Sequence, residues 1–288
     1  MSDRFLIINA DDYGMCHSAN SAVDDLFTNG FITSATLMVP CPWALDALER
    51  AKANKRINVG LHLTLNSEWE NYRWGPISRT CVPTLLDMDG FFPKDVATLL
   101  KQASSEDIRT EIASQLDWML FHDYRPTHID NHMGSLYGLE GPSYLNEVFE
   151  LCVSHDLPFR LPRFGTNFNN DSLFNASMLA NIAKQADRSK VLIIDNLLNF
   201  GRSLDSSDTY RTVKAQYISV ITNIPLGVSE LYIHPAKETE ELKAFCSTWQ
   251  MRVWEYQLML DNELQKIIED ENISLISWKS LAINRLAP

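Results

Sequence analysis

The chain has 288 residues, of which 45% are hydrophobic and 22% are charged, and its formal net charge is −12. This composition is ordinary for a globular enzyme and excludes the disordered and fibrous classes, while the acidic balance without any lysine or arginine run argues against a nucleic-acid partner. The apolar stretch near the N-terminus is too short for a signal peptide, and no window reaches the ~18 apolar residues of a membrane span. We therefore expect neither nucleic acid nor membrane as a partner.

The cysteines show neither a disulfide pattern nor a metal-binding pattern. There are five of them, an odd number, and no two stand in CxxC spacing. A disulfide framework needs paired cysteines and a thiolate metal site needs close spacing, so neither is expected. We expect reduced thiols in a cytoplasmic protein.

Strand-like apolar runs alternate with segments of helical period from the N-terminus onward. Residues 4–9 (RFLIIN) predict a strand, and residues 17–30 predict a helix that closes on Gly30, a residue type suited to a left-handed helix cap. The next predicted elements are a strand in 34–40, a helix over 44–54 and a strand in 57–65.

The same alternation continues toward the C-terminus. Helical segments at 106–122 and 143–155 each precede a strand-like run, and one long helix is expected near 238–271. The later strand-like runs are THIDNH (127–132), PFRLPR (158–163), KVLIIDNLL (190–198), SELYIHPA (229–236) and, as a candidate eighth strand, ISLISW (273–278).

Strands and helices that alternate at this spacing predict a parallel sheet. About seven strands without a break in composition favour a distorted TIM-like (β/α) barrel, and hence one domain over 1–288, rather than two domains. An open doubly wound sheet is the alternative. Against it, no GxGxxG loop follows the first strand, where NADDYG places two negative charges instead of a phosphate-binding turn.

One long interruption follows the third predicted strand. Residues 66–93 are rich in aromatic residues and proline. A loop of this length inside a compact domain is more often functional than idle. Its residues Trp69, Tyr72 and Trp74 have two interpretations: they anchor the core or the loop, or they stack on sugar rings.

Four of the seven histidines lie within or at the ends of strand-like runs, where a parallel barrel builds its active site. The two-residue period of a strand places His62 opposite its leucine neighbours, on a face that can look into the barrel. By the same rule, His128, Asp130 and His132 project to one face. His234 arrives from a separate strand and is a candidate general acid.

A carboxylate with two imidazoles is a normal ligand set for a catalytic divalent ion. The adjacent aspartates Asp11 and Asp12 fit such a site, because neighbouring residues at a strand end point in different directions. One of them can ligate the ion while the other serves as general base toward a metal-bound water. The cation then offsets their mutual repulsion.

Each of these residues also has a plainer interpretation. An isolated pair of aspartates is usually a solvated turn, and a single histidine in a strand is more often a core or loop residue than a ligand. Four histidines and three aspartates at strand ends are hard to attribute to packing, because each unpaired buried polar group costs about 1–3 kcal/mol. For Arg160 and Arg163 the alternatives are forked hydrogen bonds to carboxylates and an exposed surface pair.

Five motifs, in this order, resemble those of the YdjC-like carbohydrate deacetylases, also called the ChbG/HpnK family, which include chitooligosaccharide deacetylase. They are NADDYG, GLHLTLN, PTHIDNH, FRLPR and YIHPA, and the resemblance runs from residue 5 to about residue 236. It implies a distorted barrel, one divalent metal ion, and hydrolysis of the acetamido group of an N-acetylated sugar substrate to acetate and a free amine.

Carried over by motif, the resemblance implies metal ligation by Asp12, His62 and His132 and a general base at Asp11. His234 would be the general acid, by similarity to the terminal histidine motif of the NodB-type polysaccharide deacetylases. The family is associated with Mg²⁺, whereas an Asp-His-His set is chemically closer to Zn²⁺. The sequence leaves the choice between the two ions open.

His128 and Asp130 look, in the same comparison, like partners that orient the ligands. The chain departs from chitooligosaccharide deacetylase in two segments. HMGSLYGLEGP (132–142) stands where that enzyme has a run of histidines, and SEWENYRWGP (67–76) is unlike its loop. Both segments should border the sugar, so the resemblance indicates the chemistry without naming the particular sugar.

Two other functions stay open on the sequence. One is another metal-dependent barrel hydrolase that cleaves a phosphoester or a non-sugar amide, and the other is a non-catalytic sugar-binding barrel. A binding protein has no need of a base, metal ligands and a candidate acid together, which favours an enzyme. A monomer and a homodimer are both compatible with the sequence.

Overall fold

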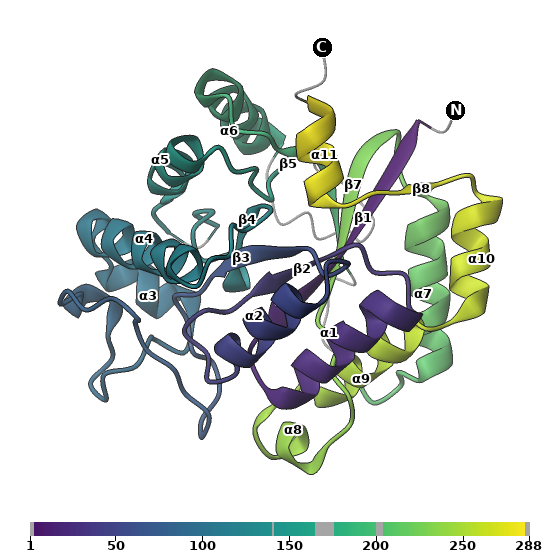
Figure 1. Cartoon of the computed structure of the whole chain (residues 1–288), viewed down its shortest axis with the longest axis horizontal. Coiled ribbons are helices and arrows are strands. Elements are labelled where there is room, and N and C mark those ends of the chain that lie inside the picture. Colours follow the sequence, from purple (N-terminus) through teal and green to yellow (C-terminus); the bar gives the residue numbers. More distant parts are fainter. Residues whose placement is uncertain (1–2, 140, 165–175, 200–203, 286–288) are drawn as a thin grey trace.

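The computed structural model describes residues 3–139, 141–164, 176–199 and 204–285. Seven parallel strands lie side by side in the order β4-β3-β2-β1-β7-β6-β5, and helices surround them (Figure 1). The strands are β1 (Arg4–Tyr13), β2 (Ser34–Leu37), β3 (Val59–Leu63), β4 (Ile129–Asn131), β5 (Pro162–Phe164), β6 (Ile194–Leu198), β7 (Gly227–Ile233) and β8 (Ser274–Leu275).

Most strands are followed by at least one helix on the outside of the sheet. The α-helices are α1 (His17–Asn29), α2 (Ala44–Ala53), α3 (Val96–Gln102), α4 (Ser105–Phe121), α5 (Leu145–His155), α6 (Ala176–Ser189), α7 (Tyr210–Thr222), α8 (Glu240–Phe245), α9 (Trp249–Leu258), α10 (Asn262–Asp270) and α11 (Trp278–Arg285). Two single 3₁₀ turns, η1 (Pro83–Leu85) and η2 (His132–Gly134), complete the set. Within the described ranges, no helix is both long and apolar enough to cross a bilayer.

The sheet curls until its two edges approach each other. Ile129 in β4 forms a parallel bridge with Phe159, which lies shortly before β5, and the Arg160 amide donates to the Ile129 carbonyl at 2.9 Å. The short β8 pairs with the start of β1. The prediction of a distorted TIM-like barrel with about seven parallel strands, and a short eighth strand near the C-terminus, is confirmed.

The two-residue period of β1 separates a core face from a polar interior face. Leu6, Ile8 and Ala10 are fully buried in the hydrophobic core that the surrounding helices share. Asn9 and Asp11 project to the other face, where the Asn9 amide donates to Asp11 Oδ1 at 2.8 Å. Polar side chains on strands therefore collect inside the barrel, as the alternation predicts.

An aromatic side chain closes the barrel at the end where the strands begin. Trp278, the first residue of α11, is fully buried together with Ile7 and Ile194. Its ring stacks on the His128 imidazole, with centroids 4.7 Å apart and planes 10° from parallel. Gly60 makes room for this imidazole, because a Cβ there would lie 2.5 Å from His128 Nδ1.

The long interruption at 66–93 is irregular, and η1 is its one short helical turn. Hydrogen bonds between side chains and backbone hold it: Trp74 Nε1 donates to the Asn66 carbonyl at 2.7 Å, and Tyr72 donates to the Met15 carbonyl at 2.6 Å. Arg73 pairs with Asp87 at 2.7 Å. The loop is thereby fixed beside the turn that follows β1.

The expectation of a left-handed cap at Gly30 is wrong. Gly30 follows α1 with φ −104° and ψ −160°, which any residue can adopt. The need for glycine comes from packing, because a Cβ on Gly30 would lie 2.6 Å from the carbonyl oxygen of Met259. The chain after α9 therefore approaches the end of α1 too closely for a side chain.

The long helix expected near 238–271 is also wrong, because the chain forms α8, α9 and α10 there. Helix α8 ends at Phe245, and the next residue, Cys246, has an extended backbone (φ −96°, ψ 105°). The side chain of Asp261 caps the start of α10 by accepting from the Glu263 amide at 2.8 Å. These two breaks separate α9 from its neighbours and allow it to pack in its own orientation.

We predict that Gly30→Ala lowers the free energy of unfolding by about 1–3 kcal/mol, because the new methyl group overpacks against Met259. Thr28→Ala, at an exposed position on the last turn of α1, is the matched control and should change stability by less than about 0.5 kcal/mol. Urea denaturation followed by circular dichroism measures both. If Gly30→Ala and the unaltered protein had the same free energy of unfolding, the close approach of the Met259 carbonyl to Gly30 would be contradicted.

Candidate active site and metal centre

Strand β1 ends in a turn that points its two aspartates toward different neighbours. The register between β1 and β2 shifts between Ala10 and Tyr13, and Asp12 adopts a left-handed backbone with φ 62°. Aspartate tolerates this conformation better than most residues. Asp11 consequently faces the barrel interior, while Asp12 faces the histidines of β3 and η2.

Asp12, His62 and His132 meet where their strands end. Asp12 Oδ1 lies 3.4 Å from His62 Nε2 and 3.3 Å from His132 Nδ1, and these two ring nitrogens are 3.3 Å apart. All three residues are buried, and Asp12 Oδ1 accepts no hydrogen bond of normal geometry. One carboxylate oxygen and two imidazole nitrogens thus converge on one point, a donor set that suits a divalent ion with an open coordination position.

Carboxylates around the two imidazoles favour their protonated forms. Burial alone would lower the pKa of His62, but Asp130, 2.6 Å from Nδ1, and Asp12 outweigh it and raise that pKa to about 10. Burial likewise lowers the pKa of His132, and Glu68, 3.0 Å from Nε2, outweighs it together with Asp12, so that this pKa is raised to about 9. A divalent ion must therefore compete with protons for these nitrogens.

Asp11 belongs to a buried cluster around the Arg160 guanidinium. Arg160 forks onto Asp11, with Nη1 to Oδ2 and Nη2 to Oδ1 both 2.7 Å, and it also contacts Asp130 at 2.8 Å and Glu230 at 2.8 Å. Burial would raise the pKa of Asp11, but the Arg160 charge outweighs it and lowers that pKa to about 2. For Glu230 burial prevails over Arg160, and its pKa is raised to about 7.

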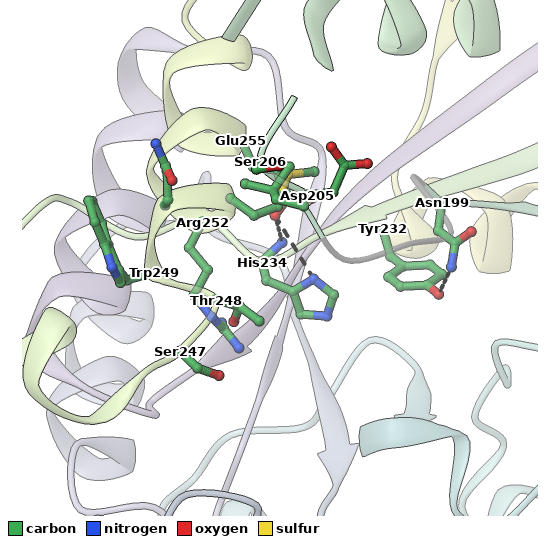
Figure 2. A pocket seen from close by; sticks show the side chains of 13 residues that line it. Asn199, Asp205, Ser206, Tyr232, His234, Ser247, Thr248, Trp249, Arg252 and Glu255 are labelled. Atoms are coloured by element: carbon green, nitrogen blue, oxygen red, sulfur yellow. Dashed lines mark hydrogen bonds and ion pairs between the residues drawn. The ribbon is translucent and has the colours of Figure 1, made fainter. Parts of the chain in front are cut away.

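His234 follows β7 and lines the same cavity as the triad. Its side chain is 35% exposed, its backbone amide donates to Glu255 Oε2 at 2.7 Å, and its Nδ1 lies 3.9 Å from the same oxygen (Figure 2). Glu255 belongs to α9, and Arg252 lies one turn before it on the same helix. Arg252 Nη1 lies 2.7 Å from Asp12 Oδ2. Helix α9 therefore reaches both the triad and His234.

Two adjoining cavities border these residues. A cavity of about 380 Å³ is lined by Asp11, the Asp12-His62-His132 triad and residues of the two segments expected to border the sugar, among them Glu68, Trp69, Met133 and Tyr137. A second cavity, of about 640 Å³, extends from His234 between α9 and residues 204–206 (Figure 2). Both are lined by Asn199, Tyr232, His234, Thr248 and Arg252.

The remaining predicted site residues have different locations. Trp69 lines the smaller cavity, whereas Trp74 is buried and contacts the edge of His132 with ring centroids 6.4 Å apart. The structure does not bring His128 or Arg163 to the site. His128 lies under Trp278 at the closed end of the barrel, and Arg163 forks onto Asp187 at 2.7 and 3.1 Å near the surface.

Several residues that contact the site were not identified from the sequence, among them Glu68, Arg252 and Glu255. Glu68 contacts His132 and lies in the long loop shortly after the strand of His62. Its nearness in sequence to the candidate ligand His62 was the one signal that could have identified it. Arg252 and Glu255 are three residues apart on a helix. That spacing is the same as in an ordinary exposed salt-bridge pair, and the sequence offers no signal that either residue points inward.

The fold and the site define a parallel (β/α)-barrel protein with a buried Asp-His-His cluster at the carboxyl ends of its strands. The sequence matches the family model of the YdjC-like proteins over residues 5–270, so the chain belongs to this family. The family resemblance inferred from the five motifs is confirmed.

Curated relatives agree with this assignment, and a solved structure shares the fold. A carbohydrate deacetylase from Clostridium beijerinckii is 29% identical over 286 residues, which cover 96% of this chain and 99% of the relative. A carbohydrate deacetylase from Geobacillus stearothermophilus is 28% identical, with 96% and 97% covered. A crystal structure of an Enterococcus faecalis protein, described as a cellobiose-phosphate cleavage protein, is 24% identical with a TM-score of 0.78 and covers 97% of this chain and 99% of its own, which shows the same fold.

We predict that the affinity for Zn²⁺ rises with pH between about pH 6 and pH 8. Because the metal-free protein holds protons on His62 and His132, whose pKa values are about 10 and about 9, binding must release one or two protons. The association constant should therefore increase ~10- to 100-fold per pH unit. Titration calorimetry in buffers of different ionisation enthalpy measures the protons released.

His17→Ala, at an exposed position on α1, is the matched control and should show the same pH dependence as the unaltered protein. A Zn²⁺ affinity independent of pH would contradict binding at the two buried imidazoles.

Proposed function

We propose that the protein is a metal-dependent deacetylase that hydrolyses the acetamido group of an N-acetylated sugar or oligosaccharide. The observation that carries the proposal is one cavity bordered by an arginine-paired carboxylate, an Asp-His-His donor set and a partly exposed histidine. The carbohydrate deacetylases among the relatives support it. Asp12, His62 and His132 would hold the ion, which would polarise the acetyl carbonyl and the attacking water.

Asp11 is the general base in this proposal. Its Oδ1 already accepts hydrogen bonds from Asn9 and Arg160, whereas its Oδ2 accepts one from Arg160 alone. A carboxylate oxygen accepts two hydrogen bonds, so Oδ2 retains a lone pair for the proton of the water. Because the Arg160 charge lowers the pKa of Asp11 to about 2, the carboxylate is ionised at neutral pH and can accept that proton.

His234 is the general acid that protonates the departing amine. It stands where the two cavities meet, so the amide nitrogen and its sugar ring must lie there while the acetyl group faces the triad. The rest of the substrate would extend into the larger cavity. Trp249 and the polar side chains of Ser206, Ser247 and Thr248 line it, a combination that suits the faces and hydroxyl groups of a sugar.

We predict acetate release from N-acetylated mono- or oligosaccharides in the presence of Zn²⁺ or Mg²⁺, and none with a chelator. His132→Ala should remove activity together with metal binding. Asp11→Asn should lower kcat by roughly 10²- to 10⁴-fold, as expected for loss of a general base, and leave the metal bound. Phosphate release without acetate release would instead favour a phosphoester hydrolase.

We predict that His234→Ala lowers kcat/KM for an N-acetylated sugar by roughly 10²- to 10⁴-fold but changes the hydrolysis of an aryl acetate much less. An amine leaves only when protonated, whereas a phenolate leaves without a proton. Parallel assays of the two substrates with the same enzyme preparation measure this difference. An equal loss on both substrates would argue against His234 as the acid.

A further inference from the structure

Helix α9 turns two ionisable side chains toward the site. Arg252 and Glu255 are one turn apart, and they are 5% and 4% exposed. Burial of a charged side chain is costly unless a partner of opposite charge or a hydrogen bond compensates it. Their partners therefore indicate why the helix carries them.

The partner of Arg252 is Asp12. Arg252 Nη1 lies 2.7 Å from Asp12 Oδ2, and among the described residues no second carboxylate lies within ion-pair distance of Arg252. Its buried Nε and Nη1 donate no hydrogen bond of normal geometry, so its charge is compensated chiefly through Asp12. Because Arg252 occupies the Oδ2 side, Oδ1 is the oxygen that faces His62 and His132.

The partner of Glu255 is His234, through both its backbone amide and its imidazole. Glu255 Oε1 is fixed by the Tyr217 hydroxyl at 2.6 Å, and Oε2 accepts from the His234 amide at 2.7 Å while it faces Nδ1 at 3.9 Å. Two residues later, the Ala236 amide donates to the carbonyl of Arg252 at 3.2 Å. The segment after β7 is thus attached to α9 at two points, of which Figure 2 shows the contact between His234 and Glu255.

We propose that Arg252 and Glu255 are positioning residues, Arg252 for the ligand Asp12 and Glu255 for His234, and that α9 holds the two ends of the site at a fixed separation. The proposal deepens the proposed function and rests on it for the role of His234. The rigid i, i+3 spacing of a helix is what relates the two contacts. Neither side chain takes part in bond making; each acts through the residue that it orients.

Arg252→Met tests the first contact through metal affinity, without any substrate. Loss of the ion pair should weaken Zn²⁺ binding by ~10- to 100-fold, as expected when the partner of a ligand is removed. Arg252→Lys retains the charge but not the planar guanidinium, and should show an intermediate loss. Equilibrium dialysis with Zn²⁺ and the visible spectrum of bound Co²⁺ are the measurements.

Gln257→Ala, at an exposed position on α9, is the matched control and should bind Zn²⁺ normally. If Arg252→Met fails to fold by circular dichroism, Arg252→Lys decides. An unchanged or tighter dissociation constant in the folded variant would overturn the role of Arg252.

Glu255→Gln tests the second contact through leaving-group dependence. It keeps the volume and an acceptor for the His234 amide but replaces the carboxyl group that faces Nδ1 with an amide. We expect kcat for an N-acetylated sugar to fall ~10- to 100-fold, with the rate on an aryl acetate and the affinity for Zn²⁺ nearly unchanged. An equal fall on both substrates, or no fall at all, would overturn the role of Glu255.

The two proposals fail in distinguishable ways. If the unaltered protein releases acetate from no substrate, the proposed function fails and the role of Glu255 fails with it. The Zn²⁺ affinity of the Arg252 variants still decides whether Arg252 positions Asp12.

Discussion

The buried guanidinium of Arg160 is the interaction on which the rest of the site depends. Three carboxylates, Asp11, Asp130 and Glu230, lie within 3 Å of it, and all three are buried. Without this cation the three could not all approach the barrel axis, because an unpaired buried charge costs several kcal/mol. Through Asp130 the same cation also orients His62, so one side chain on the segment before β5 connects β1, β3, β4 and β7.

Two arginines explain how the chain tolerates adjacent aspartates in its interior. Asp11 pairs with Arg160 from one side of the barrel, and Asp12 pairs with Arg252 from α9 on another. The left-handed backbone at Asp12 separates the two carboxylates, so each has its own counter-charge and its own surroundings. The two side chains can therefore differ in chemistry although they are neighbours in sequence.

The sequence was sufficient for the barrel, which follows from local periodicity, whereas the set Asp12, His62 and His132 was implied by the motif resemblance. The two-residue period of a strand assigns faces, and parallel strands bring their ends together. The sequence was not sufficient to predict that Arg252 and Glu255 point toward the site. The direction of a helix face depends on breaks at the ends of the helix, which local pattern does not reveal. The close approach at Gly30 depends on packing between segments that are distant in sequence, and the position of His128 under Trp278 does so as well.

Trp278 lies near the C-terminus but closes one end of the barrel, so this end can be completed only late in synthesis. Its ring covers Ile7 and His128 and lies beside Ile194, so the interior contacts residues from the first, middle and last parts of the chain at one place. During synthesis from the N-terminus, Ile7 and His128 lack this cover until α11 has emerged and packed. Contacts of such long sequence separation slow folding, and a partly formed barrel with an open base would depend on the cell to keep it from aggregating.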